Sequence, residues 1–196
     1  MIIEDNFLTK HELRVINNEI VSTGNMFPWY WHEWSTSTDY PYYGHILMRR
    51  DKVGSNSGYY DFFTAIVDRF IKKHNLFKDD YQVLRSAVND NLTFVDKACD
   101  PHVDYEREHL VFIMYLTSSS GDTNIYTKQW KEGDLPELYG EDECNELEIQ
   151  HTITPKQGKI ICYNGLNYHS ADSKKSHERR IICVYAITGE QNGMVI

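Results

Sequence analysis

The stretch Pro101-His102-Val103-Asp104-Tyr105 decides how the rest of this chain is interpreted. Side chains two residues apart face the same side of an extended strand, so His102 and Asp104 can converge. An imidazole and a carboxylate on one face are two of the three ligands of a 2-His-1-carboxylate facial triad on non-haem iron. The third ligand should be a distant histidine, and Tyr168-His169-Ser170-Ala171 supplies a candidate.

Composition indicates a folded protein with ordinary proportions. The chain has 196 residues, 41% of them hydrophobic and 25% charged, which favours one domain spanning 1–196. A net charge of −9 argues against general affinity for nucleic-acid backbone, although it does not exclude a local basic groove. The four cysteines form no C-x-x-C pair, and neither a signal-peptide pattern nor a membrane-length apolar run is present. We therefore expect a cytoplasmic protein without a membrane segment.

The hydrophobic periodicity changes along the chain. Apolar residues recur at helical spacing over 10–21, where Thr9 is a plausible N-cap and Glu12 completes a capping box, and again over 58–75. Short runs rich in β-branched and aromatic residues then predict strands at 45–49, 81–88, 92–95, 110–116, 123–126, 149–152, 159–163 and 180–187. We predict an α+β fold in which a helical part, about 1–78, packs on one sheet of a jelly-roll core, about 79–188.

Two stretches do not follow this pattern. The aromatic run 27–34 predicts either packing across the sheet or a wall over a substrate, in which Trp29, Trp31 and His32 would be the contacts. The segment 131–148 holds eight acidic residues against one Lys, and we interpret it as a solvated loop between two strands. An acidic rim would favour a basic peptide or a cationic small molecule as substrate.

Six features follow one another in a fixed order: H-x-D at 102–104, the strand 110–116 ending in Tyr-Leu, Gly121-x-Thr123, Pro155-x-x-Gly158, His169, and then Arg179-Arg180. This order resembles the 2-oxoglutarate and Fe(II)-dependent dioxygenases. The resemblance is to the prolyl-4-hydroxylase-like branch, with its small relatives in bacteriophages and cyanophages, and it covers roughly 81–187. It implies a double-stranded β-helix of the cupin type, and a host-cytoplasm location if a phage encodes the chain.

The resemblance implies a role for each matching residue. His102, Asp104 and His169 would bind Fe(II) and carry catalysis, and Tyr115 would donate its hydroxyl to the distal carboxylate of 2-oxoglutarate. An arginine at the start of the last strand would pair with that carboxylate, because a buried charge needs a partner. Strand alternation leaves Arg179 and Arg180 open, and we favour Arg180 because Ala186, which would then share its face, leaves room for a substrate.

The same resemblance extends to the strand before the triad and to the reaction. Arg85 and Asn89 share one face of that strand and would border the cosubstrate or substrate, unless Arg85 pairs with a core carboxylate. The implied reaction uses O2 and 2-oxoglutarate, with ascorbate as an optional addition. It hydroxylates a C–H bond of a peptidyl-prolyl or small-molecule substrate and releases succinate and CO2. The alternatives are a nucleic-acid oxygenase and an inactive jelly-roll binding module.

Overall fold

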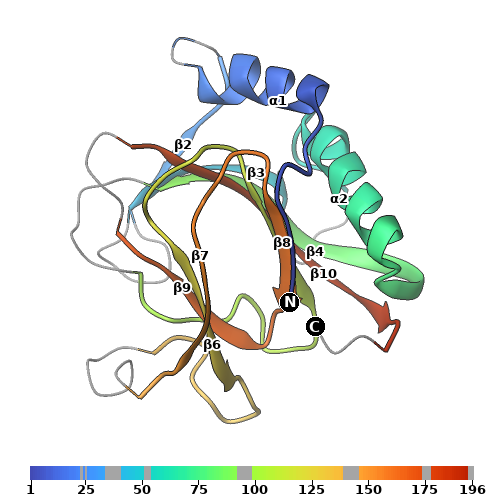
Figure 1. Ribbon diagram of the computed structural model, residues 1–196, viewed down its shortest axis with the longest axis vertical. Helices are drawn as coiled ribbons and strands as arrows, with labels where there is room; N and C mark the ends of the chain where they lie inside the picture. Colours follow the sequence, from blue (N-terminus) through green and yellow to red (C-terminus); the bar gives the residue numbers. More distant parts are fainter. Residues whose placement is uncertain are drawn as a thin grey trace.

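The computed structural model describes residues 1–22, 24, 26–33, 41–50, 54–91, 99–138, 146–173 and 178–193. Within these ranges the chain forms two antiparallel sheets and a helical layer (Figure 1). The elements in chain order are β1 (Ile2–Glu4), α1 (Lys10–Ile16), a π-helical segment η1 (Asn17–Val21), β2 (Tyr30–His32), β3 (Tyr42–Met48), α2 (Tyr60–His74), β4 (Phe77–Asn91), β5 (Leu110–Tyr115), β6 (Thr123–Gln129), β7 (Ile149–Ile153), β8 (Ile160–Asn164), β9 (Asn167–Ala171) and β10 (Arg180–Gln191).

The two sheets enclose one of the hydrophobic cores. The larger sheet has the strand order β1-β8-β5-β10-β4-β3-β2, and the smaller has the order β7-β6-β9. Buried side chains from both sheets form one cluster between them, with Ile113 and Val184 from the larger sheet and Ile125 and Ile153 from the smaller. Two sheets packed face to face bury alternate residues of each strand. This arrangement confirms the predicted α+β jelly roll.

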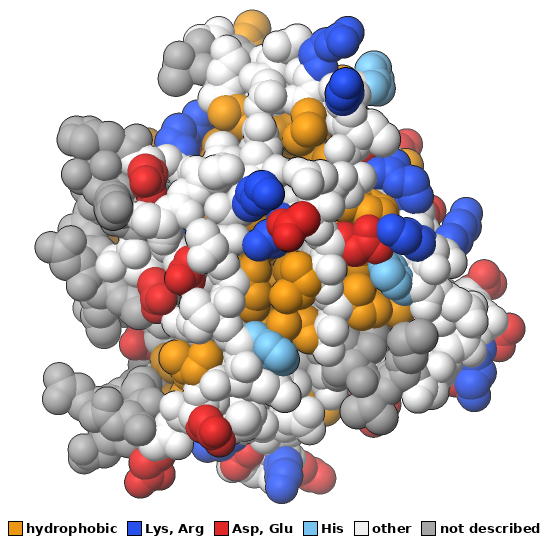
Figure 2. Space-filling model, in the orientation of Figure 1, with side chains coloured by type: hydrophobic (Ala, Val, Ile, Leu, Met, Phe, Trp, Pro, Cys, Tyr) orange, Lys and Arg blue, Asp and Glu red, His pale blue; other side chains and the backbone are white. Residues whose placement is uncertain are grey.

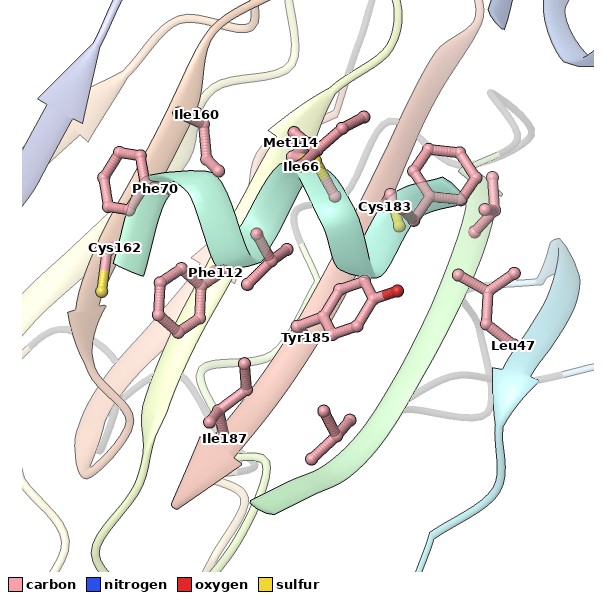
Figure 3. Packing of buried hydrophobic residues seen from close by; sticks show 14 of the residues in the cluster. Leu47, Ile66, Phe70, Phe112, Met114, Ile160, Cys162, Cys183, Tyr185 and Ile187 are labelled. Carbon is pink, nitrogen blue, oxygen red and sulfur yellow. The ribbon is translucent and has the colours of Figure 1, made fainter. Parts of the chain in front are cut away.

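The helices cover the outer face of the larger sheet. Thr9 caps α1 with a complete capping box to Glu12, as the sequence predicts. Helix α2 presents Ile66 and Phe70 to the sheet, where they meet residues of β5, β8 and β10 such as Phe112, Cys162 and Tyr185 (Figure 3). Figure 1 shows α1 and α2 together on this side, so the helical layer leaves the space between the sheets to other residues.

The structure differs from the sequence prediction in several element bounds. The first 78 residues contribute three strands, β1, β2 and β3, to the larger sheet as well as the helices. The predicted helix over 10–21 ends its α-helical part at Ile16 and continues as η1. Strand β4 spans Phe77–Asn91, longer than predicted, because it pairs along its length with β10 and over residues 86–91 also with β3. The predicted strand 92–95 and the middle of the acidic segment, 139–145, lie outside the described residues.

The surface carries both signs of charge. Figure 2 shows acidic and basic side chains interspersed on the face that it presents, with hydrophobic atoms visible between them. None of the helices in the described ranges is both long enough and apolar enough to span a bilayer.

Candidate active site

The two segments that carry the predicted triad lie side by side. His102 belongs to a loop rather than to a regular strand, and it forms an isolated antiparallel bridge with His169 of β9. The backbone N–H of His102 donates to the carbonyl of His169 at 3.0 Å, and the reverse bond measures 2.9 Å. This pairing sets the two imidazoles 4.3 Å apart between ring centroids. Asp104 joins them, with its Oδ2 3.9 Å from His169 Nε2.

Backbone carbonyls orient both rings. The Nδ1 atom of His102 lies 2.9 Å from the carbonyl oxygen of Asp100, and that of His169 lies 3.5 Å from the carbonyl oxygen of Asn167. A ligating histidine commonly donates its second ring N–H to such a carbonyl, which fixes the tautomer. Both rings therefore keep Nε2 for a ligand.

Asp104 is held in its charged form. Burial acts to raise the pKa of its carboxyl, but Arg85, His169 and His102 together hold this pKa well below its usual range. The Arg85 guanidinium donates to Asp104 Oδ1 at 3.0 Å. Burial and the neighbouring His102 lower the pKa of His169 to about 3, so His169 is neutral at physiological pH. Metal binding requires a charged carboxylate and neutral imidazoles. Burial acts to lower the pKa of His102, but Cys99 and Asp104 raise this pKa to about 9, so His102 would release a proton when a metal ion binds.

The three side chains have the ligand atoms of a facial triad, but these atoms are not yet close enough together to bind one metal ion. Two imidazole nitrogens and one carboxylate are the ligands of non-haem Fe(II) sites. No three His, Cys, Asp or Glu side chains in the described part of the chain are already close enough to hold a metal ion. Asp104 keeps Oδ2 on the side of His169, because Arg85 takes Oδ1. A metal ion would therefore have to draw the three ligands slightly closer.

The triad opens into a cavity between the sheets. Its lining includes His102, Asp104 and His169 together with Arg85, Asn89 and Arg180. The structure thus brings six of the predicted site residues to one cavity.

At one end of the cavity lies a buried arginine. Arg180 is 2% exposed, and it donates from Nε to the carbonyl of Gly121 at 3.0 Å and from Nη2 to Thr123 Oγ1 at 2.7 Å. Among the described residues, no Asp or Glu forms an ion pair with it. A buried guanidinium without a carboxylate partner is costly, and an anionic ligand would remove that cost.

Tyr115 is not among the lining residues of the cavity, but it is hydrogen-bonded to Thr123, which is. Its hydroxyl donates to Thr123 Oγ1 at 2.8 Å, and its side chain is fully buried between the sheets. Because Thr123 Oγ1 accepts hydrogen bonds from both Tyr115 and Arg180, its own proton is left to donate elsewhere. Thr123 lines the cavity, and sequence reasoning used it only as part of the Gly-x-Thr pattern.

Arg179 faces the opposite side of β10. Its guanidinium forms two hydrogen bonds with Asp90 Oδ2, at 2.9 and 2.7 Å, and a third with the carbonyl of Val21. It also lies over the ring of Trp29 at 5.8 Å. Of the two arginines that the sequence left open, only Arg180 lines the cavity.

Tyr163 was missed by the sequence reasoning. It lies on β8, lines the cavity and packs against His169 with ring centroids 5.5 Å apart. Its hydroxyl is buried and has no hydrogen-bond partner among the described residues. Burial, with the nearby charge of Asp104, raises the pKa of Tyr163 well above its usual value, so it stays a proton donor. The only sequence signal was a tyrosine in an otherwise apolar strand.

The aromatic run lies to one side of the cavity. Trp29 packs on Phe27 and Trp31 on Tyr43, and neither tryptophan lines the cavity. His32 stacks on Tyr42 at 4.6 Å, and Tyr42 does line it. A substrate role for these three residues stays a prediction, with His32 the nearest to the site.

Comparisons with known proteins give a clear result for structure. No family model matches the sequence, and no curated protein is significantly similar to it. A 2OG-Fe(II) oxygenase family protein from Burkholderia pseudomallei matches at a TM-score of 0.66 and 14% identity, over 97% of this chain and 88% of its own. The viral collagen prolyl hydroxylase of Paramecium bursaria Chlorella virus-1, solved with 2OG, matches at 0.54 and 16% identity over 96% and 95%.

HygX from Streptomyces hygroscopicus, solved with nickel, 2-oxoglutarate and hygromycin B, matches at 0.61 and 11% identity over 96% of this chain and 82% of its own. At these identities the likeness concerns the fold. The chain therefore has the fold of the 2-oxoglutarate and Fe(II) oxygenases.

Proposed function

We propose that this protein is an Fe(II)- and 2-oxoglutarate-dependent dioxygenase that hydroxylates a C–H bond. The observation that carries the proposal is Arg180, a buried cation without a carboxylate partner among the described residues, in the same cavity as His102, Asp104 and His169. The triad provides a metal site and Arg180 an anion site, and 2-oxoglutarate is a dicarboxylate that needs both.

In this proposal each residue has a distinct task. His102, Asp104 and His169 would hold Fe(II), and a triad of this kind leaves coordination positions for a cosubstrate and O2. Arg180, with Thr123 supported by Tyr115, binds the distal carboxylate of the cosubstrate. Tyr163, whose hydroxyl has no hydrogen-bond partner among the described residues, would donate to the cosubstrate. Bound Fe(II) and 2-oxoglutarate, with O2, supply the oxidising chemistry that releases succinate and CO2, and ascorbate supports the assay.

The other cavity residues position these groups. Arg85 holds Asp104 as a carboxylate through its 3.0 Å hydrogen bond, and thereby orients Oδ2 toward His169. Asn89 lines the same wall and can bond the cosubstrate or the substrate. The apolar cluster between the sheets excludes water from the reacting centre.

The substrate class is a separate part of the proposal. A peptidyl-prolyl substrate is favoured by the fold shared with prolyl hydroxylases, and a small molecule is favoured by the fold shared with HygX. We place the protein in the cytoplasm, acting as a single domain.

The test is succinate formation from 2-oxoglutarate with Fe(II), ascorbate and O2, alongside calorimetric titration of Mn(II) as an oxygen-inert metal. We expect Asp104→Ala and His169→Ala to lose both metal binding and succinate formation. His11→Ala removes an exposed histidine of α1 and should behave as the wild type. Succinate formation that survives in Asp104→Ala would contradict the proposal.

A further inference from the structure

The cavity is cationic in a chain that is acidic as a whole. The chain carries a net charge of −9, but among the described residues the cavity lining includes Arg50, Arg85 and Arg180 against two acidic residues, Asp104 and Glu137. This local charge is opposite to the one expected from the acidic segment 131–148. Arg85 is paired with Asp104, and the proposed function assigns Arg180 to the cosubstrate. Arg50 has no assigned partner.

Arg50 is held on a rigid platform at the solvent side. Its guanidinium carbon lies 4.2 Å from the ring centroid of Tyr105, a cation–π distance. Tyr105 is itself buried, and its hydroxyl donates to the carbonyl of Leu84 at 3.1 Å. Arg50 is exposed, and no acidic side chain within the described ranges forms an ion pair with it. This contact positions the guanidinium without neutralising its charge, and Arg107 lies over the same ring at 5.3 Å.

Arg50 also lines a second hollow beside the first. A second hollow adjoins the first, and both are lined by Arg50, Val103, Asp104 and Glu137. Glu106 and Arg107 also line the second hollow, so Arg50 lies where the two hollows meet, with basic and acidic side chains around it.

The Arg50 platform is far from the Arg180 end of the cavity. Tyr105 packs against Leu84 and Ala186, and Ala186 is six residues beyond Arg180 on β10. At about 3.3 Å per residue, the two strand positions are roughly 20 Å apart. A small dicarboxylate bound at Arg180 is too short to reach Arg50 as well, so Arg50 is available to a different anion.

We propose that the primary substrate is anionic and that Arg50 binds its carboxylate. This inference rests on the proposed function, because it concerns the substrate of the same site. A guanidinium bonds a carboxylate through two parallel N–H···O bonds, and the contact with Tyr105 reduces the side-chain entropy lost on binding. Within the peptide class, the site selects an acidic peptide over a neutral or basic one.

The test uses three acetylated, amidated heptapeptides with a central Gly-Pro-Gly and two flanking residues on each side, which are all Glu, all Gln or all Lys. Binding to the Mn(II)-loaded, 2-oxoglutarate-saturated protein is measured by calorimetry. We expect the Glu peptide to bind about tenfold more tightly than the Gln peptide, and the Lys peptide to bind most weakly. The preference should shrink as salt concentration rises.

Two variants identify the residue responsible. Arg50→Ala should remove the preference for Glu over Gln and leave the affinity for 2-oxoglutarate unchanged. Arg49→Ala is the matched control, because it removes the same charge from the adjacent exposed position, which lines neither hollow. It should keep the preference.

Three outcomes would overturn the inference: equal binding of the Glu and Gln peptides, a preference that survives Arg50→Ala, or weaker 2-oxoglutarate binding in Arg50→Ala. Failure of the wild type to bind Mn(II) and 2-oxoglutarate would instead overturn the proposed function. Because that titration precedes the peptide series, the two failures are distinguishable.

Discussion

Arg179 and Arg180 are adjacent in the chain but make entirely different contacts. Arg180 is buried in the cavity wall beside Thr123, whereas Arg179 binds Asp90 on the face that the helical layer covers. Alternation along a strand sends consecutive side chains to opposite faces. A charge-removing substitution at each position should therefore affect a different property.

We expect Arg180→Met to weaken 2-oxoglutarate binding by about 100-fold, because a charge-assisted bidentate contact is lost. Arg179→Met should leave that affinity intact and lower the melting temperature, since Asp90 loses two hydrogen bonds. Calorimetric titration of 2-oxoglutarate into the Mn(II)-loaded variants separates the two. Equal loss of affinity in both variants would remove the special role of Arg180.

Replacing Tyr163 should leave the ligand-free protein as stable as the wild type or more stable, but weaken its binding of 2-oxoglutarate. Tyr163→Phe removes a buried hydroxyl that has no partner in the described part of the chain, so the ligand-free protein should be as stable as the wild type or more stable. The same change should weaken 2-oxoglutarate binding about tenfold if the hydroxyl contacts the cosubstrate. Thermal unfolding and calorimetry provide the two readouts. Unchanged cosubstrate affinity would rule out the contact.

At the scale of elements, the helical layer is joined by one ion pair. Glu12 in the first turn of α1 accepts from the Arg69 guanidinium of α2 at 2.5 and 2.9 Å, while it also completes the capping box with Thr9. Burial acts to raise the pKa of Glu12, but the hydrogen bonds from Arg69 and Thr9 lower it overall. A lowered folded-state pKa means that the ionised form stabilises the fold.

We therefore expect Glu12→Gln to lower the free energy of unfolding at pH 7 by at most about 1 kcal/mol, because the Arg69 side chain is 40% exposed. The contribution is present above the ordinary pKa of 4.5 and is lost as the pH falls through the lower folded-state pKa. The difference between variant and wild type should shrink in acid. Urea unfolding at pH 7 and pH 3 measures the difference in unfolding free energy between Glu12→Gln and the wild type. Glu19→Gln, at an exposed position, is the control. An equal difference at both pH values would contradict a stabilising role for ionised Glu12.

At the scale of the whole molecule, ligand binding should be visible as stability. The proposed triad comes from the loop at 102–104 and from β9, and the proposed anion site comes from β6 and β10. A metal and cosubstrate bound there would contact both sheets. A ligand at one hundred times its Kd adds about 2.7 kcal/mol to the free energy of unfolding. For a chain of this size, that corresponds to a rise in Tm of roughly 5–10 °C.

We expect Mn(II) with 2-oxoglutarate to produce that rise and EDTA to reverse it, measured by scanning calorimetry. 2-Oxoglutarate without metal should give a smaller shift, because only the Arg180 end can then hold it. No shift with the pair of ligands would contradict a site shared between the sheets.

The sequence by itself determined most of the element types and indicated the candidate triad. The helical spacing of 10–21 and 58–75 and the short apolar runs after residue 80 are local patterns, and they predicted most of the helices and strands. The H-x-D motif and His169 are recognisable because few residue types can ligate iron. The strands β1, β2 and β9 were not predicted, because β1 and β2 have only three residues each and β9, Asn-Tyr-His-Ser-Ala, has no alternating apolar pattern.

Only the tertiary structure decided which side of each strand faces the cavity. Strand β10 is apolar on both faces, because α2 covers one face and the smaller sheet covers the other. Alternation alone therefore could not choose between Arg179 and Arg180, nor indicate that Tyr163 and Thr123 line the cavity. The Arg50 platform depends on Tyr105, fifty-five positions later in the chain. Contacts between such distant segments follow from packing, which local pattern does not encode.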